Sequence, residues 1–179
     1  RVELSVTPYT DIGGKDLTFA VIRMTPSLYI PFDPPLLRRS VLATRLSVGT
    51  IDGAKRDQVP ADKRFYAGGG GSIRGYEYQR VGPLDDDDEP FGGRSLLELG
   101  TELRLRITES FGIVGFFEGG NVYTSLYPDL DDVIRWGAGG GIRYYSPVGP
   151  FRLDIGTPVN GRDGIDDAVQ FYISLGEAF

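Results

Sequence analysis

The side chains that most often carry out catalysis are missing from this sequence. It contains no His and no Cys, which excludes imidazole acid–base chemistry, Ser-His-Asp triads, thiolate nucleophiles, disulfides and zinc sites built from His and Cys. Catalysis is not forbidden, but the charged groups that remain are 25 Asp and Glu and 19 Lys and Arg. Where Arg and Glu face one another on a strand, such long charged side chains can pair in a closed interior.

Two other patterns could hold a ligand, and neither fits. Gly70 and Gly75 have the spacing of a phosphate-binding loop, but Tyr76 stands where that motif requires Lys. The acidic run Asp85–Glu89 lacks the spaced ligands of a calcium loop and is typical of a solvated loop tip. We therefore assign no metal site. The net charge of −6 also argues against nucleic acid as a partner, because binding it requires a basic surface.

The elements that must position these charges are β-strands. Gly makes up 26 of the 179 residues, about twice its usual share, and all but one of the Asp residues, Asp154, lie in turn-like clusters with Gly and Pro. Between the clusters, residues alternate with period two, which predicts an all-β protein. The eight predicted strands lie near Val2–Thr10, Leu17–Ile30, Leu37–Ile51, Arg94–Ile107, Phe111–Tyr123, Val133–Tyr145, Phe151–Val159 and Ala168–Phe179.

The alternation separates an apolar face from a charged, glycine-rich face. In Val133–Tyr145, the glycines at 137, 139 and 141 share their face with two arginines, which indicates clearance for something pressed against the strand. A soluble β-sandwich shows the same alternation with its apolar face inward, so that class stays open. Long strands, polar faces rich in Gly and Arg, and Arg facing Glu across such a face favour a transmembrane antiparallel up-and-down β-barrel, one domain over residues 1–179.

One connection, residues 52–93, is far longer than the ordinary loops of compact domains and calls for a functional reason. It contains R-F-Y-A-G-G-G-G-S-I-R-G-Y-E-Y. Downstream come G-G-R-S-L-L-E-L-G-T-E-L-R, G-F-F-E-G-G-N-V-Y, R-W-G-A-G-G-G-I-R-Y-Y-S-P-V-G-P-F-R-L-D-I and finally Q-F-Y-I-S-L-G-E-A-F. In this order they resemble the carboxyl half of the outer-membrane assembly-factor superfamily of BamA, TamA and the two-partner secretion transporters. The tract Tyr144–Asp154 looks closest to TamA.

The resemblance implies a barrel in the bacterial outer membrane that inserts or translocates other proteins, without enzymatic chemistry or a cofactor. Its implied partners are outer-membrane lipid, client membrane proteins and the assembly machinery that reads the last strand. That assembly signal consists of alternating apolar residues and a terminal aromatic. The matching residues here are Phe171, Ile173, Leu175 and Phe179.

The family's long extracellular loop folds back into the barrel, and its R-G-F/Y motif docks on acidic wall residues. The resemblance places this motif, with the residue before it, at Ile73, Arg74, Gly75 and Tyr76 and the wall residues at Glu102 and Glu118. The family usually has Asp at the second wall position, so Glu118 is a departure with a longer side chain. We call the predicted contact the loop–barrel lock.

The residue types support such a lock independently of any family. Glu102 falls on the charged face of its strand, and two carboxylates in one lumen need a cation. A guanidinium group forms a planar fork with carboxylates and keeps its charge. The alternative is a flexible surface loop around Gly68–Gly71 in which Arg74 is solvated.

The length implies half of a family barrel, since the family has sixteen strands behind periplasmic POTRA domains and this sequence predicts eight strands and no POTRA domain. We therefore expect a truncated or engineered TamA-like segment with reduced activity. Because lipid cannot pair an exposed strand edge, we expect Ala168–Phe179 to pair with Val2–Thr10 and close a narrow ring. The alternative function is a small structural or passive-pore barrel without insertase activity.

Overall fold

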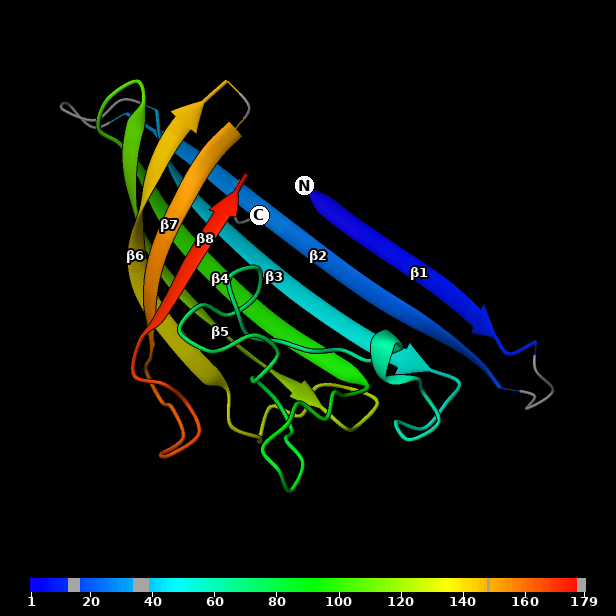
Figure 1. The fold of residues 1–179 in the computed structure, drawn as a ribbon. Coiled ribbons are helices and arrows are strands. Elements are labelled where there is room, and N and C mark those ends of the chain that lie inside the picture. Colours follow the sequence, from blue (N-terminus) through cyan, green and yellow to red (C-terminus); the bar gives the residue numbers. More distant parts are fainter. Residues whose placement is uncertain (13–16, 34–38, 148, 177–179) are drawn as a thin grey trace.

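The computed structural model describes residues 1–12, 17–33, 39–147 and 149–176, which form eight strands and one short 3-10 helix, η1 (Ala61–Lys63). The strands are β1 (Val2–Thr10), β2 (Thr18–Phe32), β3 (Ser40–Asp52), β4 (Ser95–Arg106), β5 (Phe111–Tyr123), β6 (Arg135–Ser146), β7 (Gly149–Pro158) and β8 (Gln170–Leu175). They pair in chain order as one antiparallel sheet (Figure 1). In the described residues no helix is long and apolar enough to cross a membrane.

All eight strands predicted from the alternation are present, with shifts at most of their ends. The predicted start of the third strand at Leu37 and the predicted end of the last strand at Phe179 lie outside the described residues. Period-two alternation located the strands well because each strand has one face toward the interior and one face away from it.

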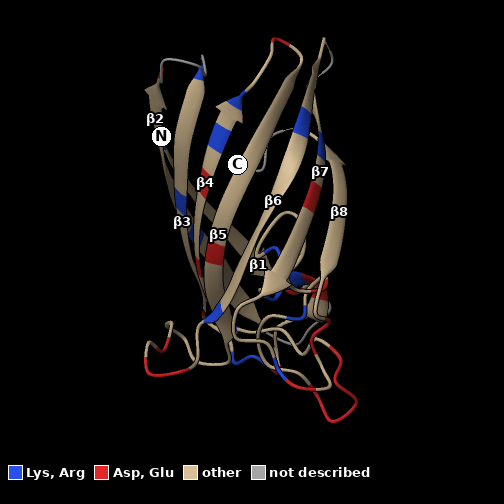
Figure 2. Cartoon of the chain, turned by 90° about the vertical axis from the view of Figure 1, so that its left-hand side faces the viewer, with Lys and Arg blue, Asp and Glu red and all other residues tan. Residues whose placement is uncertain are grey.

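The two faces of the curved sheet have opposite character. On β5, Ile113 and Phe117 are exposed while Val114, Phe116 and Glu118, on the other face, are buried. The convex face carries exposed apolar side chains: Leu4, Val6, Leu99, Leu103, Ile113, Phe117, Ile142, Leu153, Ile155, Phe171 and Ile173. Buried charges lie on the concave face, chiefly in the middle of β4 to β7 (Figure 2). This outward apolar face is the arrangement of a membrane barrel.

The connections at the two ends of the sheet differ in length. Among the connections that the structure describes in full, residues 53–94, 124–134 and 159–169 join strands at one end, whereas residues 107–110 join strands at the other. Acidic residues gather in the loops of the first end (Figure 2). Outer-membrane barrels show this asymmetry, with long loops on the extracellular side and short periplasmic turns.

Residues 53–94, here called the inner loop, lie on the concave side of the sheet (Figure 1). Three isolated bridges order this loop: Phe65 with Gly93, Ala67 with Val81, and Leu84 with Pro90. Its apolar residues join strand residues in one buried cluster, formed by Phe19, Ile51, Ala54, Val59, Phe65, Ala67, Ile73, Tyr76, Val81, Leu96 and Val122. The inner loop is therefore a packed part of the fold.

The ring closure expected from the sequence is wrong. Within the described residues the sheet runs from β1 at one edge to β8 at the other, and these two strands are not paired (Figure 1). The physical reason lies on the concave side. A closed ring of eight strands has an interior just wide enough for side chains, whereas this sheet curves around a folded chain segment.

The connection between β7 and β8 is tied to the inner loop through Arg162. Its Nη2 donates to the carbonyl oxygen of Arg80 at 2.5 Å and to Oδ1 of Asp166 at 2.7 Å. Its backbone N–H donates to Oδ2 of Asp166 at 2.7 Å. Burial alone would raise the pKa of Asp166, but the hydrogen bonds and positive charge of Arg162 lower it below its ordinary value. Asp166 therefore holds Arg162 in place as a carboxylate.

This lowered pKa predicts that the tie weakens in acid. A carboxylate whose pKa is lower in the folded state stabilises the fold above its ordinary pKa of about 4, and this contribution is lost as pH falls through the folded value. Asp166→Asn should increase protease sensitivity around Arg80 at pH 7, and the difference from the unsubstituted protein should shrink below about pH 4. Asp163→Asn, at an exposed carboxylate of the same connection, is the control. A difference that persists unchanged to pH 3 would contradict this role.

Candidate functional site

Three carboxylates meet on the concave face of neighbouring strands. Glu102 lies on β4, Glu118 on β5 and Asp154 on β7, and each side chain is at most 2% exposed. The antiparallel register brings them together, because it places Glu102 opposite Phe116 and Asp154 opposite Gly141 of β6. Three such groups without cations would repel one another strongly in a dry interior.

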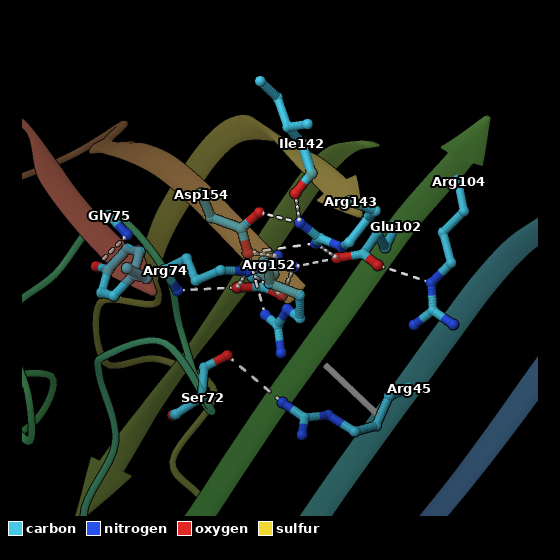
Figure 3. A network of polar contacts seen from close by, with 12 residues as sticks. Arg45, Ser72, Arg74, Gly75, Glu102, Arg104, Ile142, Arg143, Arg152 and Asp154 are labelled. Atoms are coloured by element: carbon cyan, nitrogen blue, oxygen red, sulfur yellow. Dashed lines mark hydrogen bonds and ion pairs between the residues drawn. The ribbon is translucent and has the colours of Figure 1, made fainter. Parts of the chain in front are cut away.

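The guanidinium group of Arg74, from the inner loop, contacts all three carboxylates. Figure 3 shows Arg74 beside Glu102 and Asp154. Its Nη2 lies 2.5 Å from Oε1 of Glu118 and 2.8 Å from Oε2 of Glu102, and its Nη1 lies 2.9 Å from Oδ2 of Asp154. Its Nε and its backbone N–H also donate to Glu118, the latter at 2.8 Å. The ring of Phe116 lies 3.7 Å from the guanidinium carbon, in cation–π contact.

Three arginines of the wall complete this group, which we call the Arg74 cluster: Arg74, Glu102, Glu118, Asp154, Arg104, Arg143 and Arg152. Arg104 Nε lies 2.7 Å from Oε1 of Glu102, and Arg152 Nη2 lies 3.1 Å from Oδ2 of Asp154. Arg143 forms ion pairs with both Glu102 and Asp154. The wall alone therefore has three positive and three negative side chains here.

Glu118 depends on the inner loop more than the other two carboxylates do. Glu102 and Asp154 each have ion pairs with wall arginines, whereas in the described residues Arg74 supplies every ion pair found for Glu118. Removing one partner of a buried ion pair leaves a charge that is costly to bury. Docking of the inner loop and burial of Glu118 are thus linked.

The backbone of the inner loop approaches the wall as closely as its glycines allow. Gly75 has φ of +108°, and a Cβ there would lie 2.6 Å from the carbonyl oxygen of Thr157. A Cβ on Gly137 of β6 would lie 1.9 Å from the carbonyl oxygen of Arg74. The clearance expected at Gly137 is therefore filled by the Arg74 backbone. Gly139 and Gly141 face the ring of Phe116 and the carboxylate of Asp154 instead.

The residues on either side of Arg74 are also anchored. Ile73 is fully buried in the apolar cluster. The hydroxyl of Tyr76 donates to the carbonyl oxygen of Trp136 at 3.0 Å and to Oδ1 of Asn160 at 3.2 Å. Burial raises the pKa of this hydroxyl, so it remains protonated and able to donate at neutral pH.

Two further contacts hold the loop tip. Ser72 donates its hydroxyl to Glu98 of β4, which also accepts from Arg23 of β2 at 2.9 Å. The hydroxyl of Tyr172, on β8, accepts from the N–H of Gly75 at 2.9 Å and donates to the carbonyl oxygen of Tyr76 at 2.7 Å. The loop tip is thus hydrogen-bonded to β4, in the middle of the sheet, and to β8 at its edge.

The structure brings together every residue predicted for the lock: Ile73, Arg74, Gly75, Tyr76, Glu102 and Glu118. Sequence reasoning missed Asp154, Arg143, Arg152, Glu98 and Tyr172. Asp154 carried a usable signal, because it is the one Asp predicted inside a strand. Tyr172 carried none, since its role depends on the position of a loop that is distant in sequence.

The residues predicted as an assembly signal lie away from this site. Phe171, Ile173 and Leu175 are exposed on the convex face of β8, and Phe179 lies outside the described residues. Across the part of the chain that is described, no three side chains of the metal-binding types are arranged to hold a metal ion.

The whole sequence, residues 1–179, matches the Omp85 superfamily domain. BamA of Nitratidesulfovibrio vulgaris, an outer membrane protein assembly factor, is 32% identical over 144 residues, which cover 78% of this chain and 18% of that protein. The factor of the same name from Neisseria meningitidis serogroup B is 25% identical over 182 residues, covering 81% of this chain and 22% of that protein.

A eukaryotic relative and a solved structure extend these matches. The sorting and assembly machinery component 50 homolog of Mus musculus is 28% identical over 191 residues, covering 96% of this chain and 39% of that protein. The crystal structure of BamA from Haemophilus ducreyi lacking POTRA domains 1–3 matches with a TM-score of 0.70 at 21% identity, over 96% of this chain and 37% of that chain.

The chain thus spans between 18% and 39% of the length of these curated relatives. The matches confirm the superfamily, the β-barrel class and the outer-membrane location that the sequence predicted. They do not distinguish a TamA-like member from other members. The chain belongs to the Omp85 superfamily.

Proposed function

We propose that this chain forms the loop-bearing part of the barrel wall in a factor that inserts or exports outer-membrane proteins. The proposal is supported by the relatives, two of which are named outer membrane protein assembly factors and one a component of a sorting and assembly machinery. The tract Tyr144–Asp154 favours a TamA-like member. The partners would be outer-membrane lipid, unfolded client proteins and, through β8, the machinery that assembles the chain itself.

The single observation that carries the proposal is the docking of Arg74 on three buried carboxylates. A barrel that served only as a wall or passive pore would have no need to bury a charged loop tip at such a desolvation cost. In our proposal the Arg74 cluster is the loop–barrel lock, and the inner loop is an extracellular loop folded back into the barrel. The lock holds the curved sheet and the inner loop in one arrangement and performs no bond chemistry.

The first prediction from the proposed function concerns assembly activity. Reconstituted in liposomes, the chain should accelerate the folding of a small outer-membrane barrel over empty liposomes, less strongly than a full-length family member does. Arg74→Ala should abolish this acceleration, because the inner loop loses its ion pairs with the wall. Lys55→Ala removes an exposed positive charge from the same loop and should leave it unchanged. Folding rates indifferent to the chain would favour the structural or passive-pore alternative.

The second prediction concerns the stability that Arg74 contributes. Arg74→Ala should lower the free energy of unfolding by about 3–5 kcal/mol, because Glu118 stays buried without a cation. Arg74→Lys should recover only part of this loss, since an ammonium group lacks the planar fork of a guanidinium. Urea unfolding of the protein in detergent, followed by the fluorescence of Trp136, the single Trp, measures both.

A second substitution separates the burial of Glu118 from general damage to the loop. In the Arg74→Ala background, Glu118→Gln should restore part of the stability, because the uncompensated charge is removed. Glu102→Gln should restore less, because Glu102 keeps Arg104 and Arg143 as partners. Equal rescue by the two glutamine variants would contradict the assigned dependence of Glu118 on Arg74.

The third prediction tests the close approach of the loop to β6. Gly137→Ala should push the Arg74 backbone away from the wall, since the added methyl group would lie 1.9 Å from its carbonyl oxygen. Gly115→Ala on β5 is the matched control, because a Cβ there has open space around it. Limited proteolysis should cut the inner loop faster in the Gly137 variant only. Equal cleavage of both variants would argue against this packing.

A further inference from the structure

The side chain of Asn160 extends the pairing of β6 with β7 beyond the end of the ladder. The ladder reaches Pro158, and the N–H of Val159 adds one hydrogen bond, to the carbonyl oxygen of Trp136 at 2.7 Å. Asn160 then bonds to the same end of β6 through its side-chain amide. Its Oδ1 accepts from the N–H of Trp136 at 2.7 Å, and its Nδ2 donates to the carbonyl oxygen of Ile134 at 2.8 Å.

The backbone groups around Asn160 determine which way its amide points. A side-chain amide has one acceptor end and one donor end, and Trp136 and Ile134 offer it one N–H and one carbonyl oxygen. The main-chain carbonyl oxygen of Asn160 is bound as well, by Nη1 of Arg135 at 2.8 Å. The position of Oδ1 is therefore fixed by the backbone at the start of β6.

Tyr76, from the inner loop, bonds to two oxygens held at this end of β6. Its hydroxyl lies 3.0 Å from the carbonyl oxygen of Trp136 and 3.2 Å from Oδ1 of Asn160. Both oxygens are acceptors, so the hydroxyl is the donor. Tyr76 is fully buried, and a buried hydroxyl without an acceptor is costly. Docking of Tyr76 therefore requires these two acceptors to be in place.

Gly75 separates this contact from the Arg74 cluster. It lies against the end of β7, where an added Cβ would be 2.6 Å from the carbonyl oxygen of Thr157. Arg74, before it, is bound to carboxylates of β4, β5 and β7, whereas the Tyr76 hydroxyl, after it, is bound to the start of β6 and the residue that follows β7 by two positions. Adjacent residues of the loop are thus held by different parts of the wall.

We propose that Asn160 is a positioning residue for the docked inner loop. It fixes the carbonyl oxygen of Trp136 and its own Oδ1 as the acceptors of the Tyr76 hydroxyl, and so sets the place of the loop segment that follows Arg74. The Arg74 cluster holds the loop by ion pairs, and Asn160 supplies a second anchor made of neutral hydrogen bonds. This inference concerns the docking of the chain's own loop and does not depend on the proposed function.

Hydrogen–deuterium exchange of the protein in detergent micelles tests the second anchor. Asn160→Ala should speed exchange of the Trp136 amide, which loses its acceptor, and of the Val81 amide by about 2- to 10-fold. The Val81 N–H donates to the carbonyl oxygen of Ala67 within the inner loop, so it reports on the loop itself. Asp163→Ala, at an exposed side chain of the same connection, should change neither. Faster exchange confined to Trp136 would overturn the proposal.

The amide of Arg74 shows whether the two anchors are separate. It donates to Oε2 of Glu118 at 2.8 Å and therefore reports on the Arg74 cluster. In Asn160→Ala this amide should keep its protection, because none of the ion pairs of Arg74 involves Asn160. A loss of protection at Arg74 as large as that at Val81 would mean that the loop has a single anchor and would contradict the proposal.

Tyr76→Phe tests the same contact from the loop side. It keeps the ring and removes the hydroxyl, so exchange of the Val81 amide should rise, whereas the Trp136 amide keeps Asn160 as its acceptor and should be unchanged. In the double variant Asn160→Ala/Tyr76→Phe, Val81 should exchange no faster than in the faster single variant, because both changes remove the same anchor. Effects that multiply in the double variant would show that the two residues act independently and would overturn the proposal.

Two further replacements of Asn160 distinguish positioning by hydrogen bonds from the filling of space. Asn160→Asp keeps an oxygen in the place of Oδ1, whereas Asn160→Leu keeps a side chain of similar shape without polar atoms. Compared with Asn160→Ala, the Asp variant should restore part of the Val81 protection, because Tyr76 keeps an acceptor, and the Leu variant should restore none. The rescue by Asp stays incomplete because the donor to Ile134 is lost. No rescue by Asp, or a rescue by Leu at least as large, would overturn the positioning role.

Discussion

A guanidinium group surrounded by carboxylates in a dry interior is the constraint on which the rest of the structure depends. Arg74 cannot be buried without Glu102, Glu118 and Asp154, and Glu118 cannot be buried without Arg74. This mutual requirement fixes the inner loop against β4, β5 and β7. It also explains why Gly137 and Gly75 are needed, since the backbone must come within contact distance of the wall before the charges can meet.

The occupied interior also determines the shape of the sheet. A closed ring of eight strands holds only side chains, but here a folded segment with its own apolar cluster lies inside the curve (Figure 1). The sheet is therefore open between β1 and β8 in the described residues. This open, curved sheet agrees with the likeness of the fold to BamA from Haemophilus ducreyi, which extends over 37% of that chain.

Much of this arrangement could be predicted from the sequence, and the failures have physical causes. Alternation located the eight strands, and the resemblance to the assembly-factor superfamily placed Arg74 against Glu102 and Glu118. Asp154 and Tyr172 were missed because they lie 80 and 97 residues from the loop residues they contact, so only strand register and loop position bring them there. Ring closure was predicted wrongly because the prediction paired the first and last strands with each other. It did not account for the volume that the inner loop occupies inside the curved sheet.

The equal numbers of acidic and basic side chains on the wall bear on how the loop is held. Without Arg74, the wall part of the cluster holds three arginines and three carboxylates, so these six side chains together carry no net charge. The loop is therefore held by short-range contacts, among them the ion pairs of Arg74 with Glu102, Glu118 and Asp154. Because buried ion pairs are screened little by salt, we expect the docked loop to be held at low and at high ionic strength alike.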